Sequence, residues 1–341
     1  MFTCPIPAPD PHRIRLAHGG GGEMTSRLIE DIFLPAFGTE HRTQHDSAVV
    51  SAPKGKLAIT TDSFVVHPIE FSGGDIGSLA IHGTVNDLSM SGARPLYITA
   101  GFILEEGLDT AVLSRIANSM GQAARQAGIA IIAGDTKVVE QGKGDGLYIN
   151  TSGIGIVEHS LAIAPSSIEP GDAVLVSGDI GRHGITIMSA RAGIDLQTDL
   201  QSDSANLWPS VSTLLQSGIA IHCLRDITRG GLSMTLNELA ETSGTTILLD
   251  ETAIPVCETV RSTCDLLGLD ILQTACEGRY LAIVPEKQAE QTLLALQRHN
   301  PEAARIGTVI PSGTAPLLID GLLGVRRILS KPYGEQLPRI C

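Results

Sequence analysis

The chain has 341 residues, with 37 acidic and 24 basic side chains and a formal net charge of −13. This acidic balance argues against nucleic acid as the main partner, because neutralising a phosphate backbone requires basic patches. No apolar run approaches the roughly 20 residues of a membrane span, and the N-terminus lacks the apolar segment of a signal peptide. A cytoplasmic protein without membrane contact is therefore expected.

Apolar spacing predicts the order of elements in the first half of the chain. The expected elements are helices near 28–33, at 75–91 and at 109–128, and strands at 57–61, 95–104, 129–134 and 147–157. Asp75 is placed to cap the start of the second helix, and Gly128 is placed to end the third.

A turn-rich stretch at 164–172 marks a plausible boundary between two halves. Beyond it we expect strands at 173–178, 245–250, 278–285 and 303–310, helices near 184–193, 211–218 and 287–299, and a strand end, turn and helix within 224–244. From about 320 the chain is punctuated by proline. Two α+β halves are the economical interpretation at roughly 100–200 residues per domain.

Four aspartates lie at the expected ends of strands or helices, among small or hydroxyl residues: Asp62, Asp87, Asp135 and Asp226. Magnesium takes oxygen ligands and commonly combines a few carboxylates with substrate phosphates. These side chains could therefore hold one or two magnesium ions against a nucleotide, with Lys137 neutralising a phosphate. The alternative for each aspartate is that it caps a helix or shapes a turn.

Two glycine turns precede expected helices. In the first, His18 is followed by Gly19, Gly20, Gly21 and Gly22; in the second, Arg229 precedes two glycines. Backbone N–H groups at such a turn can hold a phosphate, but neither turn has the lysine and hydroxyl residue of a P-loop. A flexible lead-in and an ordinary helix start are the alternatives.

Glu277 follows Cys276 directly before an expected strand. If burial raised its pKa, this carboxylate could act as a general base; a solvated loop glutamate is the alternative. Cys276 is either a second working thiol or a small apolar residue. Because the six cysteines form no C-x-x-C pair, a zinc site is not indicated. Free thiols are expected, buried at 223, 257 and 264.

The chain ends in "PRIC", which places a thiol on the last residue, Cys341. Chain ends are poorly ordered unless they are tied down. The preceding segment carries two prolines and little apolar material for permanent docking, and Arg339 would favour the thiolate, the nucleophilic form. These features suit a mobile carrier arm, although a frayed end is the alternative.

Taken together, the motifs "AHGGGGEM", "TTDSFVVHPIEFSGGDIGSLAIHGTVNDLSMSGA", "GFILEEGL", "AGIAIIAGDTKVV", "LRDITRGGL" and the terminal "PRIC" closely resemble the HypE family of hydrogenase maturation proteins. That family belongs to the PurM-like superfamily, with aminoimidazole ribonucleotide synthetase and selenophosphate synthetase. The resemblance covers residues from about 14 to 341. The family often has serine in place of Gly20 and asparagine in place of Cys276.

The resemblance implies a two-domain α/β PurM-like fold with a flexible tail. The expected parts are an N-terminal segment at 1–42, an ATP-binding and dimerisation domain at 43–160, a C-terminal domain at 165–318 and a tail at 319–341. It also implies a homodimer, with ATP in a cleft at the interface between N-terminal domains.

The resemblance further implies the reaction. A HypF-type carbamoyltransferase loads a carbamoyl group onto Cys341, ATP-dependent dehydration converts it to a thiocyanate, and a HypC–HypD complex receives the cyano group for the iron of a nickel–iron hydrogenase. We expect Asp62, Asp87 and Asp226 to hold Mg²⁺, and Glu277 to take a proton.

We also expect a set of residues to bind the nucleotide, and Lys137 among them to have a catalytic role as well. The set is His18, Gly19, Gly20, Gly21, Gly22, Asn86, Asp135, Thr136, Lys137 and Arg229.

Two other functions remain open on the sequence. An ATP-dependent synthetase acting on a free small molecule, such as an amide-activating or selenophosphate-type enzyme, would turn over without Cys341. A non-catalytic metal-binding scaffold would bind metal and hydrolyse no ATP, but the scattered cysteines lack ligand spacing.

Overall fold

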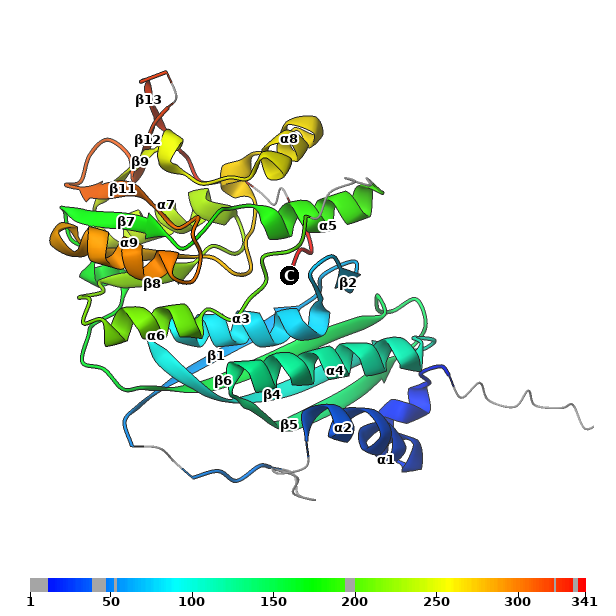
Figure 1. Ribbon diagram of the computed structural model, residues 1–341. Helices are drawn as coiled ribbons and strands as arrows, with labels where there is room; N and C mark the ends of the chain where they lie inside the picture. The colour runs from blue at the N-terminus through cyan, green and yellow to red at the C-terminus, as the bar shows by residue number, and fades with distance from the viewer. Residues whose placement is uncertain (1–11, 39–46, 52–53, 194–199, 322, 334–336) are drawn as a thin grey trace, which may run out of the picture.

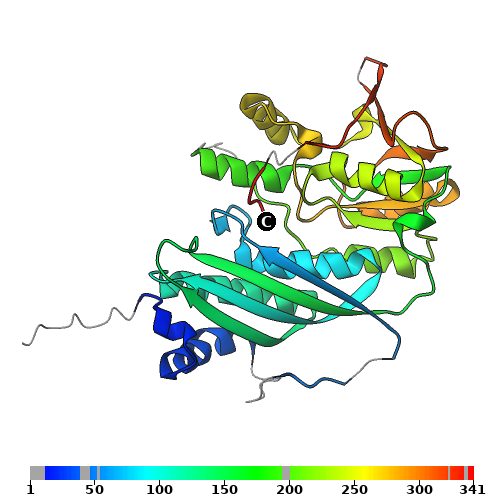
Figure 2. The ribbon, with the colours of Figure 1, turned by 180° about the vertical axis from the view of Figure 1, so that it is seen from behind.

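The computed structural model describes residues 12–38, 47–51, 54–193, 200–321, 323–333 and 337–341. The chain forms two halves, each built on its own sheet, and the C-terminus lies between them (Figures 1 and 2). No helix in these ranges is long and apolar enough to cross a membrane. Residues 1–11 of the expected N-terminal segment, Cys4 among them, and the proposed boundary at 42–43 lie outside the described residues.

The N-terminal half begins with short helical segments and continues as a sheet with two covering helices. Its elements are η1 (Leu16–Gly19), α1 (Glu23–Leu28), η2 (Ile29–Phe33), α2 (Leu34–Phe37), β1 (Lys56–Phe64), β2 (Glu70–Phe71), β3 (Gly74–Asp75), α3 (Ile76–Met90), β4 (Ala93–Glu105), α4 (Thr110–Ala127), β5 (Ala130–Val139) and β6 (Leu147–Val157).

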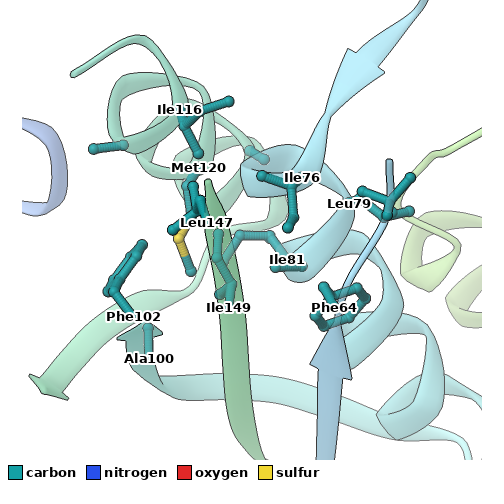
Figure 3. Packing of buried hydrophobic residues seen from close by; sticks show 14 of the residues in the cluster. Phe64, Ile76, Leu79, Ile81, Ala100, Phe102, Ile116, Met120, Leu147 and Ile149 are labelled. Carbon is teal, nitrogen blue, oxygen red and sulfur yellow. The ribbon is translucent and has the colours of Figure 1, made fainter. Parts of the chain in front are cut away.

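The four-stranded sheet has the order β1-β6-β4-β5, in which only β4 and β5 pair in parallel, across the helix α4. α3 and α4 cover one face and bury a core of Ile, Leu, Phe and Met side chains (Figure 3). The opposite face leaves Leu57, Ile59 and Ile103 exposed by 53%, 72% and 44%. This face of the sheet therefore presents exposed apolar side chains that no described helix covers.

The C-terminal half is a larger sheet with helices on it. Its elements are η3 (Pro165–Ser167), β7 (Asp172–Val176), α5 (Arg182–Ala192), α6 (Trp208–Gln216), β8 (Cys223–Asp226), α7 (Gly231–Ser243), β9 (Thr246–Asp250), η4 (Glu251–Ala253), α8 (Glu258–Leu267), η5 (Ile271–Gln273), β10 (Tyr280–Pro285), η6 (Glu286–Gln288), α9 (Ala289–Gln297), β11 (Ala304–Ile310), β12 (Leu317–Asp320) and β13 (Arg326–Ile328). The seven strands have the order β13-β12-β9-β11-β7-β10-β8.

The two halves share an apolar contact. α3 packs on its own sheet and also touches β8 and α6 of the C-terminal half. The N-terminal core cluster includes Ile187 and Ala275 from the C-terminal half. This continuity holds the end of β8 against α3, which brings together two of the segments that carry the predicted aspartates.

The predicted elements are confirmed, and the two predicted caps have the expected geometry. Asp75 accepts hydrogen bonds from the N–H groups of Gly77 and Ser78, and Gly128 ends α4 in the left-handed conformation, with φ +69°. The mixed α/β fold in two sheet-based halves agrees with the expected class.

The prediction that the aspartates lie where elements meet loops is wrong for three of the four. Asp62 is inside β1, Asp87 inside α3 and Asp135 inside β5. β1 and β5 run through their aspartates because their backbone ladders with β6 and β4 continue, to Phe64 and Val139 respectively. Only Asp226 ends an element, as the last residue of β8.

Candidate active site

A cavity of about 540 Å³ opens between the two halves of the molecule. β1 and α3 form one side, and the loop from β8 to α7, with Glu277, forms the other. Six of the residues singled out from the sequence line it: Asp62, Asp87, Asp226, Arg229, Glu277 and Cys341. We call this cavity the acidic cleft.

The carboxyl groups of the acidic cleft are held out of water. Burial raises the pKa of Asp62 and of Asp87, and it raises the pKa of Asp226 to about 7 with a further contribution from the nearby Asp87 charge. Thr60 donates a hydrogen bond to Asp87 at 2.7 Å, which orients that carboxylate. Because these carboxylates share one partly buried site, their mutual repulsion favours either a bound cation or a carboxyl group that keeps its proton.

The residues present fit a magnesium–nucleotide ligand. Within the described ranges, no three His, Cys, Asp or Glu side chains are close enough to chelate a metal ion on their own. Asp62, Asp87 and Asp226 nevertheless line one cavity, and Mg²⁺ commonly takes one or two carboxylates together with waters and substrate phosphates. The carboxylates could therefore hold the ion when phosphates complete its shell, with Arg229 adding positive charge.

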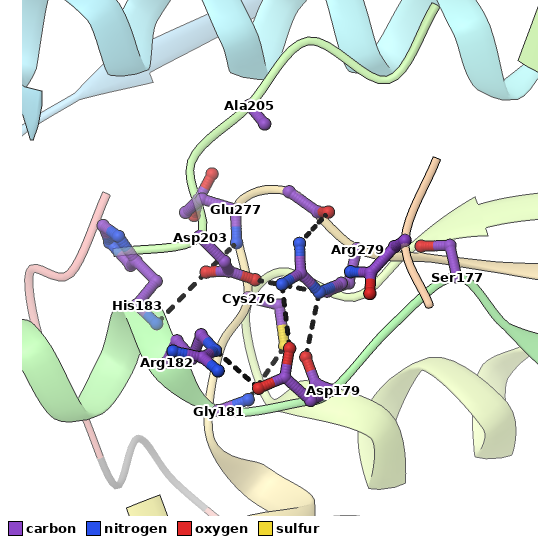
Figure 4. A network of polar contacts seen from close by, with 12 residues as sticks. Ser177, Asp179, Gly181, Arg182, His183, Asp203, Ala205, Cys276, Glu277 and Arg279 are labelled. Carbon is purple, nitrogen blue, oxygen red and sulfur yellow. Dashed lines mark hydrogen bonds and ion pairs between the residues drawn. The ribbon is translucent and has the colours of Figure 1, made fainter. Parts of the chain in front are cut away.

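Glu277 is buried, with a side-chain oxygen that has no hydrogen-bond partner. Burial first, and then the charges of Asp226 and Asp203, raise its pKa well above the ordinary value. Its backbone N–H donates to Asp203 at 3.2 Å, so the residue is fixed while its Oε1 stays unengaged (Figure 4). This is a carboxyl group prepared to exchange a proton with a ligand.

Behind Glu277 lies a buried ionic network (Figure 4). Arg279 donates to Asp179 at 2.9 Å, and Arg182 pairs with the same carboxylate at 2.5 Å. Cys276 is fully buried and accepts a hydrogen bond from the N–H of Gly181 at 3.2 Å, and burial raises the pKa of its thiol. Cys276 therefore acts as a packing residue and is not a second working thiol in this conformation.

The tail is docked in the structure, contrary to the expectation that it has little apolar material to hold it. The side chains of Leu337 and Ile340 are each 3% exposed and join the N-terminal core cluster. The N–H of Val65 donates to the carbonyl of Cys341 at 3.0 Å, and the N–H of His67 donates to Arg339 at 3.3 Å. Because these hydrogen bonds end on backbone carbonyls, the sequence of side chains could not predict them.

Docking also changes the role expected for Arg339. Its guanidinium pairs with Asp145 at 2.6 Å and donates to the carbonyl of Val65 at 3.1 Å. The guanidinium of Arg339 therefore binds groups beside the docked tail. This geometry does not support the prediction that Arg339 activates the thiol of Cys341.

A second group of predicted residues lies together but does not line the acidic cleft: His18, Gly19, Gly20, Gly21, Gly22, Asp135, Thr136 and Lys137. η1 packs on β5. A Cβ on Gly19 would lie 2.6 Å from the backbone N of Val138, so this glycine is needed for close packing. Lys137 pairs with Asp135 at 2.8 Å on an exposed surface.

Asn86 does not face the acidic cleft either. Its amide donates to the carbonyls of Ala205 and Glu277 at 3.0 and 3.2 Å, and its oxygen accepts from the N–H of Leu207 at 2.9 Å. The side chain is buried and joins α3 to two loops of the C-terminal half. In this conformation it is a contact between the two halves, with its amide N–H groups engaged by backbone carbonyls.

The remaining cysteines follow the expectation with one exception. The described cysteines are all free; Cys223 and Cys264 are buried as predicted, whereas Cys257 is only partly buried because it precedes α8 at that helix's start.

Sequence reasoning missed three residues that the structure places around the site. His183 and Arg191 on α5 contact the tail, and Asp203 supports Glu277. Asp203 lies in a polar stretch without periodicity, and the two α5 residues bind backbone carbonyls. No pattern of side-chain types could have revealed them.

Comparisons with known proteins agree with this architecture. The family model "AIR synthase related protein, N-terminal domain" matches residues 44–157, and "AIR synthase related protein, C-terminal domain" matches residues 169–317. The chain is 48% identical over 331 residues to the carbamoyl dehydratase HypE of Azotobacter vinelandii, covering 96% of this chain and 97% of that protein. It is 44% identical over 338 residues to the Escherichia coli (strain K12) protein of the same name, covering 97% and 100%.

Solved structures give the same result. A crystal structure of HypE in complex with ATP matches with a TM-score of 0.92 and 49% identity, covering 96% of this chain and 99% of that one. A HypE–HypF complex matches with a TM-score of 0.79 and 44% identity, covering 89% and 99%. Since the likeness extends over both halves and nearly the full length, the chain belongs to the HypE family of carbamoyl dehydratases, built on the two AIR synthase related domains.

Proposed function

We propose that the chain is an ATP-dependent carbamoyl dehydratase that acts on its own C-terminal residue, converting an S-carbamoyl group on Cys341 to a thiocyanate. The observation that carries this proposal is the position of Cys341, which lines the same cavity as Asp62, Asp87, Asp226 and Glu277. An enzyme acting on a free small molecule has no need to seat its own terminus in that cavity.

The proposed reaction accounts for every atom. The terminal phosphoryl group of ATP passes to the carbamoyl oxygen with release of ADP, and the C–O bond then breaks with release of phosphate. The nitrogen loses two protons as the C≡N bond forms, one to Glu277 and one to the leaving phosphate or to water. Phosphorylation makes the amide oxygen a good leaving group. Mg²⁺, when bound, offsets negative charge on the phosphates during transfer.

Each residue of the cleft has a proposed part in this reaction. Asp62, Asp87 and Asp226 hold the cation, and Arg229 faces the phosphates. Glu277, buried with an unengaged oxygen, accepts a proton from the nitrogen. Because burial raises the pKa of Glu277, it is a stronger base than a solvated glutamate once it is ionised.

We also propose a homodimer formed through the open face of the N-terminal sheet. Leu57, Ile59 and Ile103 supply exposed apolar area on that face, as expected of an interface core. Pairing these faces would bring β5 of one copy toward β1 of the other. That arrangement gives Asp135, Thr136, Lys137 and the glycine turn their proposed place at the phosphates.

The proposed partners are a HypF-type carbamoyltransferase, which loads Cys341, and a HypC–HypD complex, which receives the cyano group. A HypE–HypF complex among the matched structures supports the first. Free thiols suit a reducing compartment, and we place the protein in the cytoplasm.

The intact mass of the carbamoylated protein, before and after Mg-ATP, tests the proposal. The wild type should lose the mass of one water, and Cys341→Ala should carry no carbamoyl adduct. ATP hydrolysis at equal rates in both proteins, with no change in tail mass, would instead indicate a free small-molecule substrate.

A further inference from the structure

The docked tail is held largely through its backbone. Arg191, near the C-terminal end of α5, donates hydrogen bonds to the carbonyls of Pro338 and Arg339 and, at 2.5 Å, to the carbonyl of His67. One guanidinium therefore ties the tail to the segment that follows β1. Arginine suits this task because its planar fork presents several donors in fixed directions.

His183, in the first turn of α5, holds the next carbonyl along the tail. Its ring is fully buried, with Nε2 2.6 Å from the carbonyl oxygen of Ile340 and Nδ1 2.7 Å from the hydroxyl of Ser202. Since a carbonyl oxygen only accepts, Nε2 carries the proton and Nδ1 accepts from Ser202. Burial lowers the pKa of His183, which favours this neutral form.

The two residues are eight positions apart on α5, so they lie on the same face of the helix. Together they bind the carbonyls of three consecutive residues, 338–340. We propose that Arg191 and His183 are positioning residues that hold Cys341 in the acidic cleft for dehydration, a role that rests on the proposed function. We call the pair the tail clamp.

The tail clamp is connected to the proposed base. One oxygen of Asp203 accepts the backbone N–H of His183 at 3.1 Å and that of Glu277 at 3.2 Å (Figure 4). The same carboxylate thus sets the position of the residue that grips Ile340 and of the residue proposed to accept the proton. Through it, the tail and Glu277 are held in a fixed relation on one side of the cleft.

Backbone recognition has a chemical advantage for a tail that is modified. The clamp's hydrogen bonds to residues 338–340 end on backbone carbonyls, which are the same whatever group the thiol carries, so the carbamoylated and cyanated tails can dock alike. Arg339 adopts φ +54°, an uncommon conformation for a residue other than glycine. It persists because the bonds on both sides of the tail hold it.

The first experiment measures how often Cys341 leaves the cleft, using iodoacetamide on the full-length, unmodified protein without ATP. The alkylated fraction of the C-terminal peptide is followed by mass spectrometry. Arg191→Gln removes two hydrogen bonds between a charged group and the tail, which should shift the docking equilibrium about 100-fold. A docked state favoured about tenfold then becomes disfavoured about tenfold, so the alkylation rate should rise about tenfold. Arg191→Lys, which keeps the charge but not the fork, should fall between Arg191→Gln and the wild type.

Arg305→Gln is the matched control, because Arg305, on β11, pairs with Glu286 on an exposed surface of the C-terminal half. It should alkylate at the wild-type rate. An unchanged rate in Arg191→Gln, or an equal rise in the control, would overturn the clamp. His183→Gln tests the second contact and should also raise the rate.

The second experiment measures single-turnover dehydration of the carbamoylated protein. Arg191→Gln should slow it about tenfold, matching the loss of docked tail, while ATP affinity stays at the wild-type value. Faster alkylation with an unchanged dehydration rate would overturn the positioning role. If the wild type itself shows no dehydration, the proposed function fails, whereas the alkylation rates still decide whether Arg191 holds the tail.

Discussion

Replacing Asp226 with asparagine should flatten the pH dependence of stability in the metal-free, nucleotide-free protein. Burial and the charge of Asp87 raise the pKa of Asp226 from 3.8 to about 7. The folded state therefore holds this proton more tightly than the unfolded chain. The resulting stabilisation is complete below about pH 4 and is lost as the pH rises toward 7.

The magnitude follows from the two pKa values. The difference between 3.8 and about 7 corresponds to about 4 kcal/mol, at about 1.4 kcal/mol per pKa unit. Asp226 is only partly buried and lines an open cavity, so screening by water lowers this figure. Wild-type stability should fall by a few kcal/mol between about pH 4 and pH 7. Asp226→Asn, which mimics the protonated form, should have a smaller slope, and the raised pKa values of Glu277, Asp62 and Asp87 account for the slope that is left.

Urea unfolding in the presence of a chelator, at a series of pH values, gives the free energy of unfolding directly. Asp135→Asn is a suitable control, since Asp135 is exposed and the hydrogen bond from Lys137 lowers its pKa. It should keep the wild-type slope. Parallel curves for the wild type and Asp226→Asn would refute the assignment of a retained proton to Asp226.

Two further substitutions test the site and its support. Glu277→Gln should slow single-turnover dehydration by about 10²- to 10⁴-fold, the usual contribution of a general base, with ATP affinity unchanged. The control is Glu286→Gln, an exposed residue paired with Arg305, which should react at the wild-type rate. Equal rates in the two variants would show that Glu277 is not the base. Gly278→Ala should destabilise the fold by about 3 kcal/mol in urea unfolding, because its Cβ would lie 1.8 Å from the carbonyl oxygen of Asp203. Gly20→Ala, whose nearest contact is an ordinary 3.7 Å, should cost far less, and equal losses would contradict the steric argument.

The elements that the sequence predicts well are those whose signals are local. α4 has apolar positions at helical spacing and both caps in place, and its bounds agree closely with the prediction. β1 and β5 were expected to end too early, since a backbone ladder can continue through polar residues such as Asp62 and Asp135. For the same reason Asp62 and Asp135 lie within strands.

Convergence in space is the part of the site that the sequence could not supply. Asp62, Asp87, Asp226 and Glu277 meet because α3 is held between its own sheet and the end of β8. Lys137 has the same kind of sequence context, yet it lies on β5, away from the cleft. Only the packing of the two halves shows which of these residues line the cleft and which do not.

The tail shows why a carrier arm can look mobile in sequence and still dock. Ordering residues 337–341 costs roughly 5–10 kcal/mol, at about 1–2 kcal/mol per residue. Burying Leu337 and Ile340 returns about 3–6 kcal/mol, which leaves a deficit of a few kcal/mol. Hydrogen bonds to the tail's carbonyls, each contributing about 1 kcal/mol, are of the size needed to close that deficit. The docked state is then close in free energy to the undocked one, as an arm that is loaded outside and dehydrated inside requires, and a single donor such as Arg191 is enough to shift the balance.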